Sequence, residues 1–116
     1  MCRWILELDA RSGKALTGMA DSFTVHALLQ IQALINDYPR LLDAGDLVGL
    51  GLLFQAAAVH FEGRPEPVVA DPAEITRMFA DFVRLYDGVP RTRHLICNLT
   101  VKPAATGVAH ARSTVL

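Results

Sequence analysis

The sequence is 116 residues long and 12.6 kDa, which is the size of one domain. Hydrophobic residues make up 52% of it and charged residues only 20%, so intrinsic disorder is excluded. The formal net charge is −1, which makes nucleic acid an unexpected partner, and no apolar run approaches the ~20 residues of a membrane-spanning helix. Cys2 and Cys97 are too few for a disulfide framework or a zinc motif. We therefore expect a reduced, cytoplasmic protein without a bound metal.

The first twenty residues predict a strand followed by a linker. Trp4, Leu6 and Leu8 alternate with acidic residues, which is the pattern of a half-buried strand and not of a signal peptide. The residues between that strand and position 20 show no periodicity. We therefore expect an N-terminal strand and linker extension at 1–20 and a separate domain at 21–116.

Two helices are predicted next, at 23–44 and 46–55. The first carries an apolar stripe at steps of three and four residues, interrupted by Pro39, which is expected to kink it. Gly45 is the expected left-handed cap of this helix, and Asp46 is the expected N-cap of the next. The apolar stripe consists of Leu28, Ile31, Ile35, Tyr38 and Leu42.

The second half of the chain predicts a hairpin, a helix and two longer strands. Asp71-Pro72 marks the start of the helix, and the apolar spacing extends it over 72–87. The resulting order of elements is that of an α+β fold, with the helices covering a concave face of one sheet. The four strands of that sheet are expected at 57–62, 66–70, 92–102 and 107–116, the last two joined by a turn over 103–107.

Four parts of the sequence carry a family resemblance: Tyr38 to Asp46, Leu53-Phe54, Ile75 with Phe79, and Thr92-Arg93-His94 with Asn98. They resemble the SnoaL-like and ketosteroid-isomerase-like proteins of the nuclear transport factor 2-like superfamily. The resemblance implies a cone-shaped α+β barrel, in which three helices pack on a strongly curved mixed or antiparallel sheet and enclose an apolar pocket. It also implies isomerase, dehydratase or related chemistry without a cofactor, and in many members a homodimer.

The chain departs from this family pattern in two places. The family's sheet continues for two more strands after the position of Leu116, so Val108–Leu116 is expected to be an exposed apolar edge. The predicted N-terminal strand is an addition to the pattern. Either it fills part of the sheet, or the domain begins near Met19 and is incomplete.

The resemblance implies a catalytic triad of Tyr38, Asp43 and His94. Dehydratases of the superfamily place a tyrosine, an aspartate and a histidine at the matching positions. Elimination of water needs a base and an acid, and a histidine that titrates near neutral pH serves as either. The aspartate would orient the imidazole, and the tyrosine would donate to a substrate oxygen. Each residue also fits a structural position, in the core or at a helix end.

A second arrangement competes with that triad. The catalytic carboxylate of ketosteroid isomerases corresponds to Glu62, and His60 lies two residues before it on the same face of the expected strand. Together with three aromatic residues of the predicted pocket, these two are expected to contact substrate. The aromatic residues are Phe54, Phe79 and Phe82.

Three classes of function stay open at this point. The leading one is a cofactor-independent lyase or isomerase that acts on a small apolar, ring-containing molecule. The second is a binding or dimerisation module of the same fold, and the third is a small subunit of a ring-hydroxylating oxygenase. The mean hydropathy of +0.30 favours a homodimer, through the convex face of the sheet or the edge at Val108–Leu116.

Overall fold

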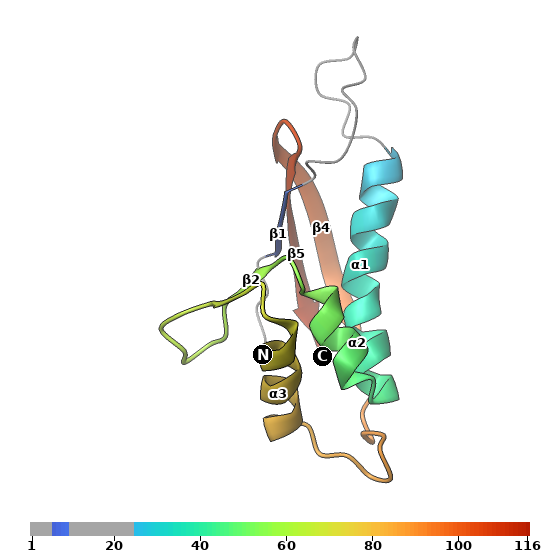
Figure 1. Cartoon of the computed structure of the whole chain (residues 1–116). Helices are drawn as coiled ribbons and strands as arrows, with labels where there is room; N and C mark the ends of the chain where they lie inside the picture. The colour runs from blue at the N-terminus through green and yellow to red at the C-terminus, as the bar shows by residue number, and fades with distance from the viewer. Residues whose placement is uncertain (1–5, 10–24) are drawn as a thin grey trace.

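The computed structural model of the protein describes residues 6–9 and 25–116. Within these residues the fold is α+β, with three helices and antiparallel strands (Figure 1). The predicted linker lies outside the described residues. The elements in chain order are β1 (Leu6–Asp9), α1 (Val25–Ala44), α2 (Leu47–Leu53), β2 (Ala58–Val59), β3 (Val68–Val69), α3 (Pro72–Phe82), β4 (Ile96–Ala105) and β5 (Val108–Val115).

The junction of α1 and α2 is built as predicted. Gly45 has a φ of 76°, and its N–H donates to the carbonyl of Leu42, while the Asp46 N–H donates to the carbonyl of Leu41. This is the Schellman arrangement, in which a left-handed residue closes a helix. The Asp46 carboxylate then accepts from the Gly49 N–H at 2.8 Å and begins α2. Helix α1 itself continues across Pro39.

Helix α3 begins as predicted but ends five residues early. The Asp71 carboxylate caps it by accepting from the Glu74 N–H at 3.0 Å, with proline at the first helical position. Phe82 is its last residue, whereas the prediction extended the helix to position 87. The apolar spacing continues to Tyr86, but Asp87 and Gly88 both have positive φ and form a tight turn.

Because of this tight turn, the last helical turn predicted for α3 does not form. Tyr86 and Val89 exchange two backbone hydrogen bonds across it, at 2.8 and 3.2 Å. An Asp-Gly pair between two such residues is the usual signal for a turn with two left-handed positions. The chain from Val83 to Leu95 consequently runs as a loop between α3 and β4, and we call residues 83–95 the α3–β4 loop.

The strands form two separate sheets instead of the single predicted one. Strands β2 and β3 have two residues each and pair only with each other, and the connection between them contains Gly63, Pro65 and Pro67. The other sheet has the order β1-β5-β4. Its β4–β5 hairpin turns at Thr106-Gly107, the last two residues of the turn predicted at 103–107. Pro103 lies instead within the edge strand β4, opposite Ala109.

Strand β1 pairs antiparallel with β5, with Leu6 opposite Ala111 and Asp9 opposite Val108. The N-terminal strand therefore joins the sheet, which is the first of the two alternatives that the sequence left open. The prediction of an exposed edge along β5 is wrong for Val108–Ala111, which lies between two strands. The sheets are not curled, so the expected closed barrel is not confirmed in the part of the chain that is described (Figure 1).

The apolar core has two parts. The larger part holds the C-terminal half of α1 together with α2 and α3, and Phe79, Leu50 and Ile75 are its most deeply buried side chains. The smaller part joins Ile31 of α1 to Ala109 and Ala111 of β5. Helix α1 therefore lies along the sheet, while α2 and α3 pack on each other beside its end.

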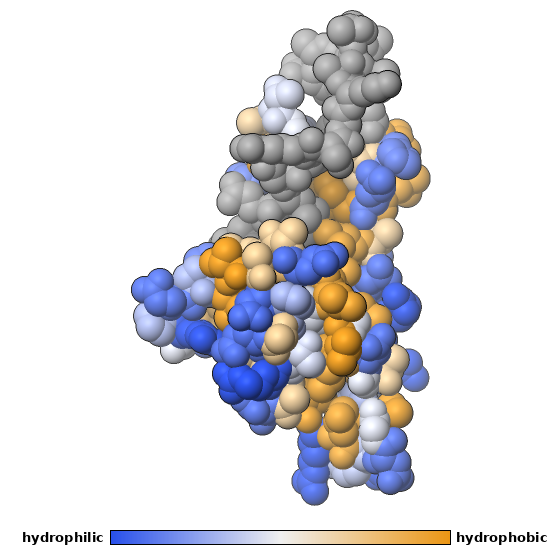
Figure 2. Space-filling view, viewed as in Figure 1, coloured by the Kyte–Doolittle hydropathy of each residue, from blue (hydrophilic) through white to orange (hydrophobic). Residues whose placement is uncertain are grey.

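The surface of the sheet that faces away from α1 is polar. Thr100, Lys102, His110 and Arg112 are exposed there, in neighbouring cross-strand positions. Exposed apolar side chains instead occur on the helices, on β3 and in the α3–β4 loop. Figure 2 shows an apolar band over the region of α2, whose Val48 and Leu52 are exposed. Homodimerisation stays a prediction. Of the described helices, none has the length and apolar character needed to cross a membrane.

Candidate functional site

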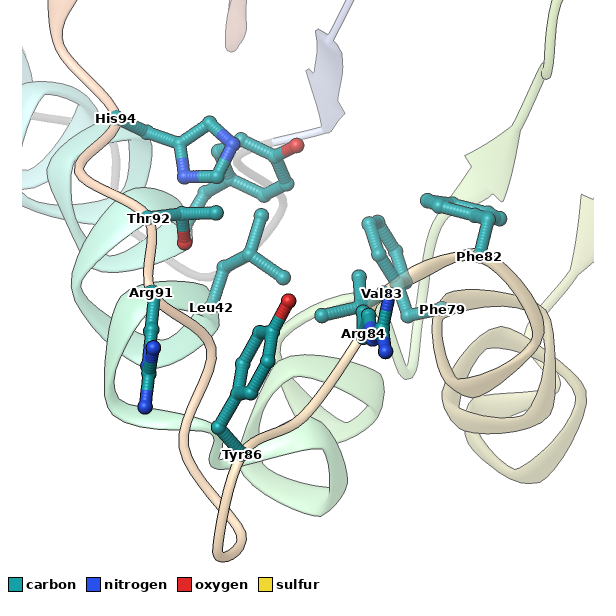
Figure 3. A pocket seen from close by; sticks show the side chains of 10 residues that line it. Leu42, Phe79, Phe82, Val83, Arg84, Tyr86, Arg91, Thr92 and His94 are labelled. Carbon is teal, nitrogen blue, oxygen red and sulfur yellow. The ribbon is translucent and has the colours of Figure 1, made fainter.

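A half-open pocket with a volume of about 390 Å³ lies between α1, α3 and the α3–β4 loop (Figure 3). Its floor is apolar and its polar groups come mostly from the loop. Helix α1 contributes Tyr38 and Leu42, and α3 contributes Phe79 and Phe82. The loop residues that line it are Val83, Arg84, Tyr86, Arg91, Thr92 and His94.

Asp43 and His94 form a close pair beside this pocket. Asp43 is in the last turn of α1, and its Oδ1 lies 2.6 Å from Nδ1 of the His94 ring. The backbone N–H of His94 donates to Oδ2 of the same carboxylate at 2.7 Å, and the Thr92 hydroxyl donates to Oδ1 at 2.8 Å. One carboxylate on α1 thus fixes both the backbone and the side chain of the loop at His94.

The environment of Asp43 keeps its carboxylate ionised. Its side chain is only 9% exposed, and this burial by itself raises the pKa. The hydrogen bonds from the His94 backbone, the His94 ring and Thr92 outweigh burial, so the pKa of Asp43 lies below its ordinary value. Asp43 also lies at the C-terminal end of a helix, where the macrodipole disfavours negative charge. The carboxylate is therefore placed for its contacts with the loop and not for the stability of α1.

This contact decides which nitrogen of His94 is available to a ligand. An ionised carboxylate accepts a hydrogen bond, so Nδ1 carries the proton that is shared with Asp43. In the neutral ring Nε2 is then left as the acceptor. Figure 3 shows the second ring nitrogen on the pocket side of the imidazole, and the His94 side chain is 26% exposed. His94 therefore presents a proton acceptor to the pocket and rests on Asp43 behind it.

Tyr38 lines the same pocket from the middle of the aromatic core. Its ring is 6.3 Å from that of Phe54 and 6.1 Å from that of Phe79, measured between centroids. Phe79 and Phe82 line the pocket as expected, with centroids 5.3 Å apart. Phe54 supports Tyr38 from behind and does not line the pocket. The structure thus brings Tyr38, Asp43 and His94 into one region, with Asp43 in contact with His94.

The structure does not bring His60 and Glu62 to this pocket. Both are exposed on the arm that connects β2 and β3, which extends away from the helices in Figure 1. Strand β2 ends at Val59, so the two residues do not share a strand face as expected. The carboxylate arrangement of a ketosteroid isomerase is therefore not assembled around His94.

Several pocket residues were not predicted from the sequence. The sequence shows Thr92 only as part of the family motif and places Tyr86 on a helix, and it does not single out Arg84. The Cζ atom of the Arg91 guanidinium lies 4.5 Å from the Tyr86 ring centroid. The Asp87-Gly88 pair was the available signal, because it turns the chain and places these side chains around the pocket.

A second hollow lies on the other side of the Asp43–His94 pair. It is lined by both residues of the pair and by Arg40 and Arg93, among others. Arg40 is engaged by Asp37 at 3.0 Å. In the described part of the chain, no three His, Cys, Asp or Glu side chains are grouped as a metal site requires.

Comparison with known proteins agrees with the fold and places the chain in a family. No curated protein and no solved structure gives a significant match. The family model of the SnoaL-like domain matches residues 24–116, which include every residue of the pocket and of the Asp43–His94 pair. The chain belongs to the SnoaL-like domain family, within the nuclear transport factor 2-like superfamily.

Proposed function

We propose that the protein is a cofactor-independent lyase or isomerase that moves a proton on a small, apolar, ring-containing substrate. The observation that carries this proposal is the 2.6 Å contact between Asp43 and Nδ1 of His94, which leaves the other ring nitrogen toward an apolar pocket. Membership of a family that includes isomerases and polyketide cyclases is consistent with it.

Dehydration is the leading reaction. In a substrate with a hydroxyl group β to a carbonyl, Nε2 of His94 takes the proton from the carbon α to the carbonyl. The electron pair of that C–H bond forms the new C=C bond, and the C–O bond breaks. The imidazolium returns the proton to the departing oxygen, which leaves as water. Asp43 stabilises the imidazolium and holds the ring in place, as the carboxylate of a histidine–carboxylate pair does.

Isomerisation uses the same residue without a leaving group. His94 takes the α proton of an unsaturated ketone and returns it two carbons further along, so that the double bond moves and nothing is lost. Both reactions place negative charge on the carbonyl oxygen in the transition state. Tyr38 is the proposed donor to that oxygen. The hydroxyl of Tyr86 points into the pocket in Figure 3 and is a second donor in reach of a ligand.

The test follows the proton and requires no knowledge of the natural substrate. Cyclic ketones, β-hydroxy ketones and β,γ-unsaturated ketones are incubated with the protein in deuterium oxide, and NMR measures the loss of the α-proton signal. We expect exchange above the buffer rate. His94→Ala should reduce it by about 10²- to 10⁴-fold, the usual contribution of a general acid–base group. Tyr38→Phe should cost about ten- to several-hundred-fold.

Two variants serve as controls. His110→Ala removes an exposed histidine of β5 and should leave the exchange rate unchanged. Glu62→Gln should also leave it unchanged, because Glu62 lies on the β2–β3 arm. A large loss in Glu62→Gln with a small loss in His94→Ala would overturn the assignment of His94 and favour an isomerase-type carboxylate.

A non-catalytic ligand-binding module is the second candidate. The half-open pocket and the uncurled sheets favour it, because acid–base catalysis benefits from a site that excludes water. The same panel separates the two. Ligand-induced stabilisation with no exchange above the buffer rate for any ketone would establish the binding module in place of the enzyme.

A further inference from the structure

The mouth of the pocket carries a concentration of positive charge that the proposed acid–base chemistry does not use. Arg84 and Arg91 both line the pocket, next to Tyr86. The Cζ atoms of the two guanidinium groups lie 5.3 and 4.5 Å from the centroid of the Tyr86 ring. Figure 3 shows the two side chains on opposite sides of that ring. The protein as a whole has a net charge of −1, so this charge is a local feature.

Neither arginine is neutralised within the described residues. The ion pairs of the described residues use Arg40, Arg64 and Arg77, and none of them involves Arg84 or Arg91. The residues that line the pocket include no Asp or Glu. Asp43, which lies beside the pocket, accepts hydrogen bonds from Thr92 and His94.

Gathering two cations around one ring has an electrostatic cost. Each guanidinium gains from the face of Tyr86, a cation–π contact worth about 0.5–1 kcal/mol at an exposed site. The two charges repel each other, however, because they lie no further apart than the Debye length of about 10 Å in 0.1 M salt. An anion at the pocket mouth would relieve this repulsion, and guanidinium groups bind carboxylates through strong charge-assisted hydrogen bonds.

We propose that Arg84, Arg91 and Tyr86 form a carboxylate-recognition site, so that the ligand of this pocket is an apolar ring compound with a carboxylate group. The apolar rings lie against Leu42 and Phe79, and the carboxylate lies at the mouth, beside Tyr86 and the arginines that flank it. This inference rests on the proposed function only for the reaction that the bound ligand would undergo. The binding itself is independent of His94.

The test compares an acid with its uncharged amide. Naphthoate and naphthamide have the same fused rings and nearly the same shape, and their affinities are measured by titration calorimetry at neutral pH. We expect the unmodified protein to bind naphthoate about tenfold more tightly, as charge-assisted contacts at a partly exposed site allow. This preference should decrease as the salt concentration rises.

Variants locate the preference on the two arginines. Arg84→Gln combined with Arg91→Gln should abolish the preference, and Arg91→Lys should keep part of it because the charge remains. Arg112→Gln is the matched control, since Arg112 is an exposed arginine of β5 without an ion pair among the described residues, and should keep the full preference. Equal binding of acid and amide, no binding of naphthoate, or a preference that survives in the double variant would each overturn the proposal.

The same experiment separates this proposal from the acid–base function. His94→Gln should keep the preference for naphthoate while it loses proton exchange. If His94→Gln retains proton exchange, the acid–base function fails, and the carboxylate site stands on its own affinity ratio. If the exchange depends on His94 but naphthoate and naphthamide bind equally, only the carboxylate site fails.

Discussion

The helices and the α3–β4 loop contribute to the pocket in different ways. The helices are closed by local signals, contribute most of the buried apolar side chains, and supply the pocket floor. The loop has little buried surface, yet it supplies His94, Thr92, Arg84, Tyr86 and Arg91. It is positioned by a few contacts, chiefly those to Asp43 and to the end of α1 at Gly45. Stability and chemistry are therefore located in neighbouring but different parts of the chain.

The largest effect on stability should come from the helical part. Phe79 is 1% exposed, and Phe79→Ala should lower the free energy of unfolding by about 3–5 kcal/mol. Phe82, on the same helix and in the same pocket, is 62% exposed, and Phe82→Ala should cost less than about 1 kcal/mol. Urea denaturation measures both. Equal losses would remove the distinction between floor and mouth of the pocket.

The contact between α1 and the loop should break in a glycine variant. Gly45 has positive φ, and a Cβ at this position would overlap the carbonyl oxygen of Gly88. Gly45→Ala should therefore cost about 2–3 kcal/mol, from backbone strain and from displacement of the loop. Gly63→Ala has the same strain but no atom within 4 Å, and about 1–2 kcal/mol is expected. If thermal denaturation shows no difference between the variants, the loop does not depend on this contact.

A smaller effect is expected at Asp43. Asp43→Asn replaces a charged acceptor of three hydrogen bonds and should cost about 1–3 kcal/mol near neutral pH. Because the folded-state pKa lies below the ordinary value of 3.8, this stabilisation is present above that pH and is lost as the pH falls through the folded-state pKa. The unmodified protein and Asp43→Asn should therefore converge in acid. If the free energies of unfolding of the two proteins ran parallel over this pH range, the Asp43 carboxylate would not be an ionised anchor of the loop.

The smallest effect is expected at the start of α3, away from the pocket. Hydrogen bonds from Arg77 and Arg64 lower the pKa of Glu74 from 4.5 to about 2. Its stabilising contribution is thus present above pH 4.5 and is lost as the pH falls toward 2. Because the ion pairs of Glu74 lie at the surface, Glu74→Gln should only flatten the dependence of the melting temperature on pH in this range, and leave proton exchange unchanged. A change in exchange would show that α3 transmits surface charge to the pocket.

The helical part was predictable because its signals are local. Gly45, Asp46 and Asp71 each act within a few residues, and the apolar spacing identifies which faces are buried. The pairing of the strands was not predictable. Strands β2 and β3 pair only with each other, and no short segment of sequence determines which strand another will pair with. The continuation of the apolar spacing from Phe82 to Tyr86 also predicted one helical turn too many.

The candidate site was predictable only in part. Tyr38, Asp43 and His94 came from a family motif, and the structure adds that Asp43 contacts the ring and the backbone of His94 together. Arg84 and Tyr86 were missed because their positions depend on two left-handed residues, Asp87 and Gly88. A single tight turn therefore decides whether these side chains lie on a helix or line the pocket.

The pairing of β1 with β5 has a consequence for the order in which the sheet is made. Strands β4 and β5 are joined by the two residues Thr106-Gly107, so this hairpin closes a very short loop. Leu6, in contrast, lies opposite Ala111, almost the full length of the sequence away. Long loops close at a higher entropic cost and slow the formation of contacts between distant segments. We therefore expect β1, made first, to be the last strand to dock, onto a hairpin that is already formed.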